Sequence, residues 1–331
     1  MASALVVLIY YVSHRRQHQS SWNDIREGIL LFFSRFAVYR LALSESVSKS
    51  WRPHLLVFAK ENDGSLLQFS EAVNQGKGFF TMASFVKTPL KSEFEKKELQ
   101  KSITKKLMDQ KIQAFVEVSY AEKIYLSMNQ MIESYGLGPL KPNTIICGIH
   151  KNDDLEDFAC VINKAYHRHC NMVILNSQND SLDSRFVGGD LHVWWHPHHK
   201  ENGDLMLVIA YMLTRHTLWK KAKVCLKVLV ESEIDRARVL EEFKELSRIR
   251  RLSLNIEILV TDDPVNNYLK YVTAISKDAS IVFLSLAPPL SETPVEEYYT
   301  YLKSMVSFSK EFPSVGLVLS SEFTPLNDVL S

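Results

Sequence analysis

The hydrophobic pattern of this chain alternates between short runs of β-forming residues and longer amphipathic stretches. Runs rich in Val, Ile, Leu and Phe predict strands at 53–59, 79–86, 114–120, 144–149, 171–176, 191–195, 223–230, 255–260, 279–286 and 314–321. Apolar positions at helical spacing predict helices at 64–74, 92–112, 121–135, 155–169, 203–219, 233–251, 264–276 and 293–310. Strands that alternate with helices indicate right-handed βαβ crossovers and mostly parallel sheets covered on both faces.

A polar, turn-rich segment divides this alternation into two units of the same α/β architecture. Residues 177–189 (SQNDSLDSRFVGG) have no periodicity. We therefore predict a first subdomain at 51–180 and a second at 190–331, with no residue-level repeat between them. In the second, every residue from Leu205 to Leu213 is apolar or aromatic. A helix that is apolar on all sides but too short for a membrane span should lie buried, between the two units or at a subunit contact.

The N-terminal residues differ from the rest of the chain. In residues 1–16 about eleven mostly apolar residues precede His14, Arg15 and Arg16, whereas a bilayer span takes about twenty. A signal peptide has its charges before the apolar run, so the order here fits the last half of a transmembrane helix instead. Basic residues after such a span would place the following chain in the cytoplasm. The alternative is a buried N-terminal helix of a soluble protein.

Residues 21–46 are predicted to form an amphipathic helix. Ser21 and Asp24 have the spacing of a capping box. Apolar positions then recur at spacings of four and three, which places one continuous seam on a helix face. The seam residues are Ile25, Ile29, Phe32, Phe36, Tyr39 and Leu43. Two interpretations remain open: an ordinary core helix, or a connecting helix that packs against its own copy in a homodimer.

Composition narrows the class of protein. The chain has 331 residues, 46% hydrophobic and 23% charged, with a formal net charge of +1. That length accommodates about two ordinary domains. A net charge near zero lacks the basic excess typical of nucleic-acid binding, so no nucleic-acid partner is expected. The four cysteines form no CxxC pair, which favours reduced thiols in the cytosol over a disulfide framework.

Motifs for catalysis or metal binding are missing from the sequence. It contains no GxSxG, Walker A, GxGxxG or HExxH pattern, so we expect no catalytic residues and no enzyme. Histidines cluster at His192, His196, His198 and His199, mostly on a Pro-containing loop. Because zinc sites usually hold their ligands at defined spacing on rigid elements, we interpret this cluster as a solvated turn and expect no metal site.

The segment GLGPLKPNT, residues 136–144, has the glycines and the lysine of a phosphate-binding loop. A phosphate loop follows a strand and opens a helix, whereas this segment follows a predicted helix and precedes a strand. We therefore interpret it as a corner. Gly136 should adopt a left-handed conformation after the helix, and Lys141 should point to solvent.

Several of these stretches together resemble one family, the cation-chloride cotransporters, in their cytosolic C-terminal domain. GLGPLKPNT is similar to that family's helix-to-strand corner, and SWRPHLLVFA at 50–59 to its first strand. Residues 190–229 resemble a second signature, in which a strand with paired tryptophans precedes an apolar helix that ends near a further tryptophan. The order of the N-terminal half-span and seam helix is also similar. The resemblance covers essentially the whole chain.

The resemblance implies two successive universal-stress-protein-like, Rossmann-like units after a membrane-proximal helix. It further implies a regulatory domain that forms a homodimer on the cytoplasmic face of the membrane. Its partner would be the transmembrane transport domain of the same polypeptide, which carries Cl⁻ together with Na⁺ or K⁺. The chain itself would not be a transport unit.

A rival interpretation is a nucleotide sensor, because universal-stress-protein folds often hold ATP. The ligand would lie outside the carboxyl ends of the strands, where the strand order reverses. In the first unit this places Ala59, Lys60, Gly148 and Lys151 at the crevice. Gly148 stands alone where the ATP-binding members have several spaced glycines. We therefore expect no cofactor and no tight binding of ATP.

Overall fold

The computed structural model describes residues 19–43, 52–89, 92–149, 154–177, 188–250, 252–289 and 295–321. The chain divides into two parts. The helical part comprises residues 1–47 and 137–140, and the α/β part comprises residues 48–136 and 141–331. Each part is described by itself.

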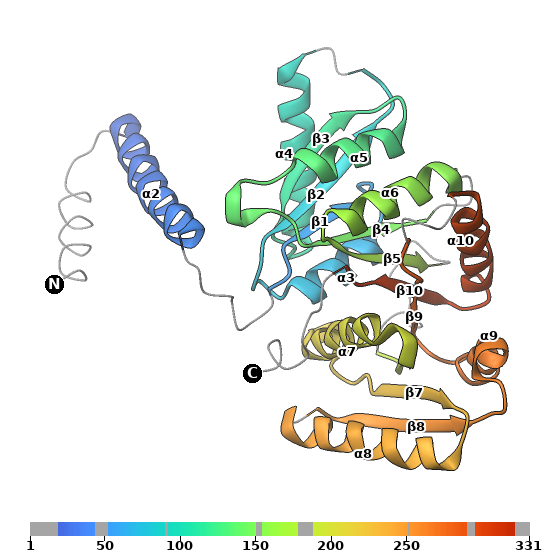
Figure 1. The fold of residues 1–331 in the computed structure, drawn as a ribbon. Coiled ribbons are helices and arrows are strands. Elements are labelled where there is room, and N and C mark those ends of the chain that lie inside the picture. The colour runs from blue at the N-terminus through green and yellow to red at the C-terminus, as the bar shows by residue number, and fades with distance from the viewer. Residues whose placement is uncertain are drawn as a thin grey trace. The chain divides into compact units, whose positions relative to one another are not determined.

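The α/β part is built on one ten-stranded sheet (Figure 1). All ten predicted strands are present, with small changes at their ends. They are β1 (Leu55–Phe58), β2 (Phe80–Val86), β3 (Phe115–Tyr120), β4 (Thr144–Gly148), β5 (Asn171–Ser177), β6 (Leu191–Trp195), β7 (Val224–Val230), β8 (Leu254–Val260), β9 (Ile281–Ser285) and β10 (Ser314–Leu319). The strand order is β3-β2-β1-β4-β5-β10-β9-β6-β7-β8.

One antiparallel pairing joins the two predicted units into this single sheet. Strand β10 runs antiparallel to β5, from Ser314 opposite Ser177 to Leu319 opposite Met172. All other described pairings are parallel. The sequence predicted one sheet for each unit. The units share one sheet because both fifth strands are apolar and buried, so that each covers the open edge of the other.

The two halves, β1–β5 and β6–β10, have the same internal strand order when each is counted from its outer edge. Helices cover both faces of the sheet, as the alternating pattern predicted. Helices α3 (Gly64–Asn74), α4 (Glu93–Asp109), α7 (Lys200–Arg215) and α8 (Glu233–Arg250) pack on one face. Helices α5 (Ile124–Ser134), α6 (Leu155–His167), α9 (Pro264–Ile275) and α10 (Val295–Ser309) pack on the other face.

Helix α7 is buried between the two halves, as its continuous apolar run predicted. It packs on β6, β9 and β10 of its own half and on α3 of the other half (Figure 1). Its residues from Leu205 to Ala210 are at most 1% exposed. Near the same boundary, Gln75 Nε2 donates a hydrogen bond to the carbonyl of Met212, and the rings of Phe69 and Phe283 lie 6.4 Å apart.

The helical part contains α2, which spans Gln19–Ala42 where the sequence predicted 21–46. Ser21 lies within the described helix, so the predicted capping box is not at its first residue. The predicted half-span at residues 1–16 lies outside the described residues. Within the part of the chain that the structure describes, no helix is long and apolar enough to cross a bilayer.

The corner before β4 has the conformation that its sequence predicted. Gly136 has a φ of +105°, and the Lys141 side chain is exposed. Asn143 then anchors the start of the strand: its amide nitrogen donates to the Arg52 carbonyl at 2.8 Å, and its Oδ1 accepts from the His54 backbone at 3.0 Å.

Candidate functional site

A cavity of about 360 Å³ lies at the carboxyl ends of β1 and β4. The strand order of the first half reverses between these two strands, since β2 lies beside β1 while β4 and β5 follow on its other side. A crevice at such a reversal is where open α/β sheets bind ligands. The cavity is lined by Phe58, Ala59, Lys60, Asp63, Ala83, Phe85, Lys87, Ile124, Tyr125, Met128, Cys147, Gly148 and Phe158.

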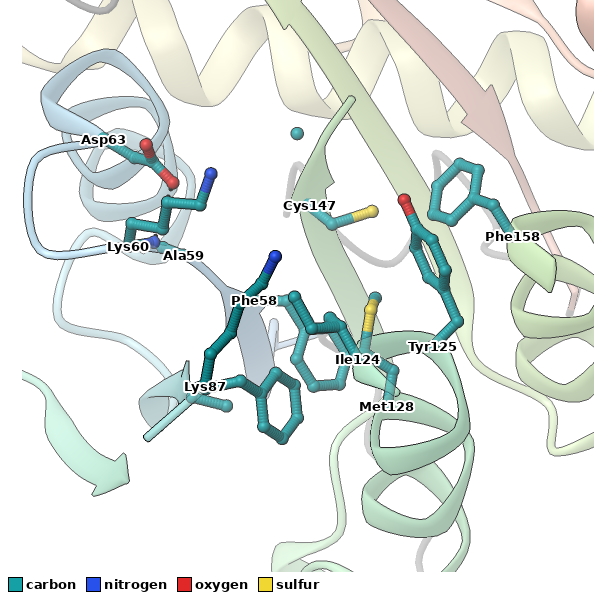
Figure 2. Close-up of a pocket in the computed structure, with 13 residues that line it drawn as sticks. Phe58, Ala59, Lys60, Asp63, Lys87, Ile124, Tyr125, Met128, Cys147 and Phe158 are labelled. Atoms are coloured by element: carbon teal, nitrogen blue, oxygen red, sulfur yellow. Dashed lines mark hydrogen bonds between the residues drawn. The ribbon is translucent and has the colours of Figure 1, made fainter. Parts of the chain in front are cut away.

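Two lysines supply positive charge at the mouth of this cavity. Lys60 follows β1 and Lys87 follows β2, and both are exposed. Figure 2 shows their amino groups directed toward the space in front of the strand ends. Asp63 accepts a hydrogen bond from the Lys60 backbone at 2.7 Å, which fixes the turn into α3. The two lysines can therefore hold an anionic group. The Asp63 carboxylate is already hydrogen-bonded within the turn.

The floor of the cavity is aromatic and apolar. Phe58 and Phe85 stack with ring centroids 5.8 Å apart. Helix α5 contributes Tyr125, whose ring lies 5.4 Å from that of Phe158 on α6. A planar group could therefore rest on the floor while an anionic group met the lysines at the mouth.

Three of the four residues predicted for this crevice line the cavity together: Ala59, Lys60 and Gly148. Lys151 lies outside the described residues. Sequence reasoning missed Lys87, although its position directly after the second strand would have indicated it, because the carboxyl ends of neighbouring parallel strands share one edge. Gly148 is not needed for steric reasons, since an added Cβ would meet its nearest neighbour, the carbonyl oxygen of Leu175, at an ordinary 3.7 Å.

The histidine cluster separates into two environments. His192 lies within β6, where its Nδ1 is 2.9 Å from Ser276 Oγ. Burial, and secondly the charge of Lys227, lower the pKa of His192 to about 4. The rings of His196 and His199 lie 5.6 Å apart beyond the strand, and the side chain of His198 is outside the described set. Within the described residues, no group of three potential ligands is placed to hold a metal ion.

The predicted seam of α2 lies on a helix whose apolar residues are exposed. The six seam residues Ile25, Ile29, Phe32, Phe36, Tyr39 and Leu43 are 37% to 80% exposed. Other apolar residues of the helix, among them Leu30, Leu31 and Phe33, are exposed as well. Leu43 lies in the turn after the helix, where its amide donates to the Tyr39 carbonyl at 3.1 Å. An apolar surface of this kind is typical of a helix that has a partner.

Comparison with known proteins identifies the class first. Two structures from Pseudomonas aeruginosa have the same fold. A functionally unknown protein from strain PAO1 matches with a TM-score of 0.52 and 12% identity, over 85% of this chain and 97% of that one. A candidate universal stress protein from strain UCBPP-PA14 matches with a TM-score of 0.52 and 12% identity, over 86% and 98%. The chain therefore has a universal-stress-protein-like α/β fold.

Two further matches concern the cotransporters. Residues 64–190 match the model of solute carrier family 12, the family of the cation-chloride cotransporters. The cytoplasmic domain of a prokaryotic cation chloride cotransporter matches with a TM-score of 0.57 and 17% identity, over 84% of this chain and 99% of that one. These matches confirm the resemblance stated from the sequence: residues 64–190 match the family model, and the chain has the fold of that cytoplasmic domain.

Proposed function

We propose that this chain is the regulatory and dimerisation domain of a cation-chloride cotransporter. The observation that carries the proposal is the exposed seam of α2 in a chain that matches this family. An isolated apolar helix is marginal in water, so its apolar face needs a partner surface. A second copy of the same helix offers a complementary seam, since the repeat of four and three is that of a coiled coil.

The partner of the domain is, in this proposal, the transmembrane transport domain of the same polypeptide. That domain carries Cl⁻ with Na⁺ or K⁺ as a symporter, and the present chain lies on the cytoplasmic face and relays cytosolic signals to it. The proposal includes no catalytic role, no resident metal and no nucleic-acid partner. The net charge of +1 supports the last of these.

Sedimentation velocity of residues 19–331 tests the dimer. We expect a two-fold dimer at tens of micromolar, because most soluble homo-oligomers of this kind have closed two-fold symmetry. Replacing both Phe32 and Phe36 by Asp should produce monomers, since it places charges in the seam. The unfolding transition of the α/β part should stay unchanged.

A matched control separates the seam from general apolar character. Ser34 and Leu41 lie on the opposite side of α2, about half a helical turn from the seam at 100° per residue. The Ser34→Asp, Leu41→Asp variant introduces the same two charges there and should remain dimeric. A wild-type protein that sediments as a monomer, or equal loss of the dimer in both variants, would refute the proposed interface.

Nucleotide sensing is a second candidate function, favoured by the cavity that joins Ala59, Lys60 and Gly148. We expect weak ATP binding at most, because Gly148 is the single glycine among the described lining residues. Such a site offers few free backbone N–H groups for the phosphates. Titration calorimetry with ATP should give a dissociation constant above about 10 µM, which corresponds to roughly 7 kcal/mol. A lower constant that rises in Lys60→Ala and Lys87→Ala would favour the sensor.

A further inference from the structure

A second cavity, of about 470 Å³, lies in the other half of the sheet. It is at the carboxyl ends of β6 and β7, with α8 and α9 as its walls. Neither the family match nor the proposed dimer gives this cavity a role. Its volume is within the range of small-molecule sites.

The floor of this second cavity is apolar and largely buried. Trp195 is 6% exposed and packs its ring edge-to-face on Phe243, with centroids 5.1 Å apart. Leu229 and Val239 add aliphatic surface that is less than a tenth exposed. Tyr268 closes one side, and its hydroxyl donates to the Trp194 carbonyl at 3.3 Å. Aromatic faces of this kind attract both apolar bodies and cations.

The polar lining of the second cavity is predominantly acidic. It includes the carboxylates of Glu231, Asp235 and Glu242 and one guanidinium, that of Arg238. Arg238 is already paired with Asp235 at 2.7 Å, and Glu242 lies 3.6 Å from Lys200. No ion pair of the described residues includes Glu231. Glu231 is therefore the carboxylate that can receive a cation from outside.

The helix ends at this cavity do not favour an anion. Ser232 Oγ accepts from the Asp235 backbone at 3.1 Å near the start of α8. Asp263 Oδ1 accepts from the Asn266 backbone at 3.0 Å at the start of α9. Hydrogen-bond acceptors of the protein thus occupy positions that a bound phosphate would need.

We propose that the cavity between α8 and α9 binds an organic cation, an amine or guanidinium on an apolar body. The apolar body would lie on Trp195 and Tyr268, and the cationic group would pair with Glu231. The same chemistry is found in a free amine and in a lysine or arginine side chain of a peptide. The two sources differ in the space they need beyond the amino group.

Calorimetry with three probes of one shape tests the charge preference. 4-Phenylbutylamine, 4-phenylbutanol and 4-phenylbutyrate share their apolar body and differ in charge. We expect the amine to bind with a dissociation constant of about 0.1–1 mM, typical of a ligand of this size. The alcohol should bind several-fold more weakly, and the carboxylate more weakly still. The blocked peptide acetyl-Phe-Lys-Phe-amide distinguishes the sources: tighter binding than that of the amine indicates a peptide side chain, and weaker binding indicates a free amine.

Two variants test the residues. Glu231→Gln changes an exposed side chain, so the fold should be kept. It should raise the dissociation constant of the amine by about threefold to tenfold, because one partly exposed charge-assisted contact is lost. The dissociation constant of the alcohol should stay unchanged. Val239→Trp fills the cavity and should abolish binding of both probes. Lys60→Ala, in the cavity of the first half, should leave the dissociation constants of both probes unchanged.

Three results would overturn the proposal. These are stronger binding of the carboxylate than of the amine, equal affinity of the amine for wild type and Glu231→Gln, and no detectable binding of the amine at 10 mM, roughly tenfold above the weakest constant expected. None of these results depends on the oligomeric state, so the inference and the proposed dimer fail or stand separately.

Discussion

The two halves of the sheet have the same strand order, but different side chains lie at the point where that order reverses. In the first half the crevice between β1 and β4 is an open cavity with Lys60 and Lys87 at its mouth. In the second half the aromatic side chains of Trp194 and Tyr268 lie near the end of β6. Trp194 is fully buried, with its ring 5.8 Å from that of Tyr268 in an edge-to-face arrangement.

Hydrogen bonds also fix the loop that follows β9. Tyr298 donates to the Ala287 carbonyl at 3.1 Å, and the Ala287 amide donates to the Tyr301 hydroxyl at 2.9 Å. Burial raises the pKa of both tyrosines, so these hydroxyls stay protonated at neutral pH. The loop after β9 is thereby tied to α10.

The difference shows that the backbone arrangement alone does not define a ligand site. Both halves have parallel strands whose order reverses beside the first strand, yet the side chains at the strand ends differ. The open cavities also differ in charge: lysines line the first and carboxylates the second. Function must therefore be argued from each site and not from the fold.

The prediction with the largest expected effect compares two corners that join a helix to the next strand: the corner between α5 and β4, and the corner between α9 and β9. The first needs Gly136, with a φ of +105°, where an added Cβ would lie 2.8 Å from the Lys141 Cα. The second has no positive φ among its residues 276–280, and Ser276, the C-cap of α9, has a φ of −108°. Gly136→Val should therefore lower the free energy of unfolding by about 3 kcal/mol, through backbone strain and steric overlap. Urea denaturation measures this change.

Two variants serve as controls for the corner. Lys141→Ala, at an exposed side chain, should change stability by less than about 0.5 kcal/mol. Ser276→Ala should cost about 1–2 kcal/mol, because Ser276 Oγ accepts from the Trp194 indole at 2.9 Å and that donor would lose its partner. If Gly136→Val costs no more than Lys141→Ala, the two corners do not differ as described.

Local patterns predicted the elements of this fold well. Each of the ten strands was found, because buried parallel strands give continuous apolar runs between turn residues. Helix α7 was placed correctly, because a run apolar on all sides requires a buried position. The single sheet was not predicted, since the antiparallel contact between β5 and β10 joins residues more than a hundred positions apart and leaves no local signal.

The candidate site was only partly predictable. Strand order located Ala59, Lys60 and Gly148, but the sequence could not show which side chains lie at the matching place in the second half, because these come from two helices. A short repeat also escaped notice. Lys60-Glu61-Asn62 precedes α3, and Lys200-Glu201-Asn202 forms the first residues of the corresponding helix α7. Four residues separate the end of β6 from Lys200, whereas one separates the end of β1 from Lys60, and this difference obscures the alignment.

A second test compares one glycine from each half. Gly203 lies where an added Cβ would be 1.8 Å from Trp195 Cδ1, whereas at Gly148 the nearest atom would be 3.7 Å away. Gly203→Ala should destabilise the protein by about 2 kcal/mol, since overpacking exceeds the gain in helix propensity. Gly148→Ala should change stability by less than about 0.5 kcal/mol. Equal effects in urea denaturation would show that the second half is not the more tightly packed.

The smallest expected effect concerns acid. Leu56 is the second residue of β1, and His192 is the second residue of β6, so the second half carries a titratable group where the first has an apolar one. The pKa of His192 is lowered to about 4 by burial and by Lys227. Around this histidine lie Lys227 and Glu257, Asp190 and Asp278. Its folded pKa is below the unfolded value of about 6.5, so the unfolded state binds more protons between these values.

The free energy of unfolding should therefore keep its full value above pH 6.5 and should fall as the pH drops toward 4. His192→Gln removes the titration and keeps a side chain that can bond Ser276. The loss of unfolding free energy between pH 7 and pH 5 should shrink by about 1 kcal/mol in this variant, after allowance for solvent screening of a partly exposed ring. His54→Gln provides the comparison in the first half, where burial and Arg52 lower the pKa in the same direction. Urea denaturation at both pH values measures the two losses. An unchanged acid response in His192→Gln would mean that other groups cause it, and a larger change in His54→Gln would place the acid sensitivity in the first half.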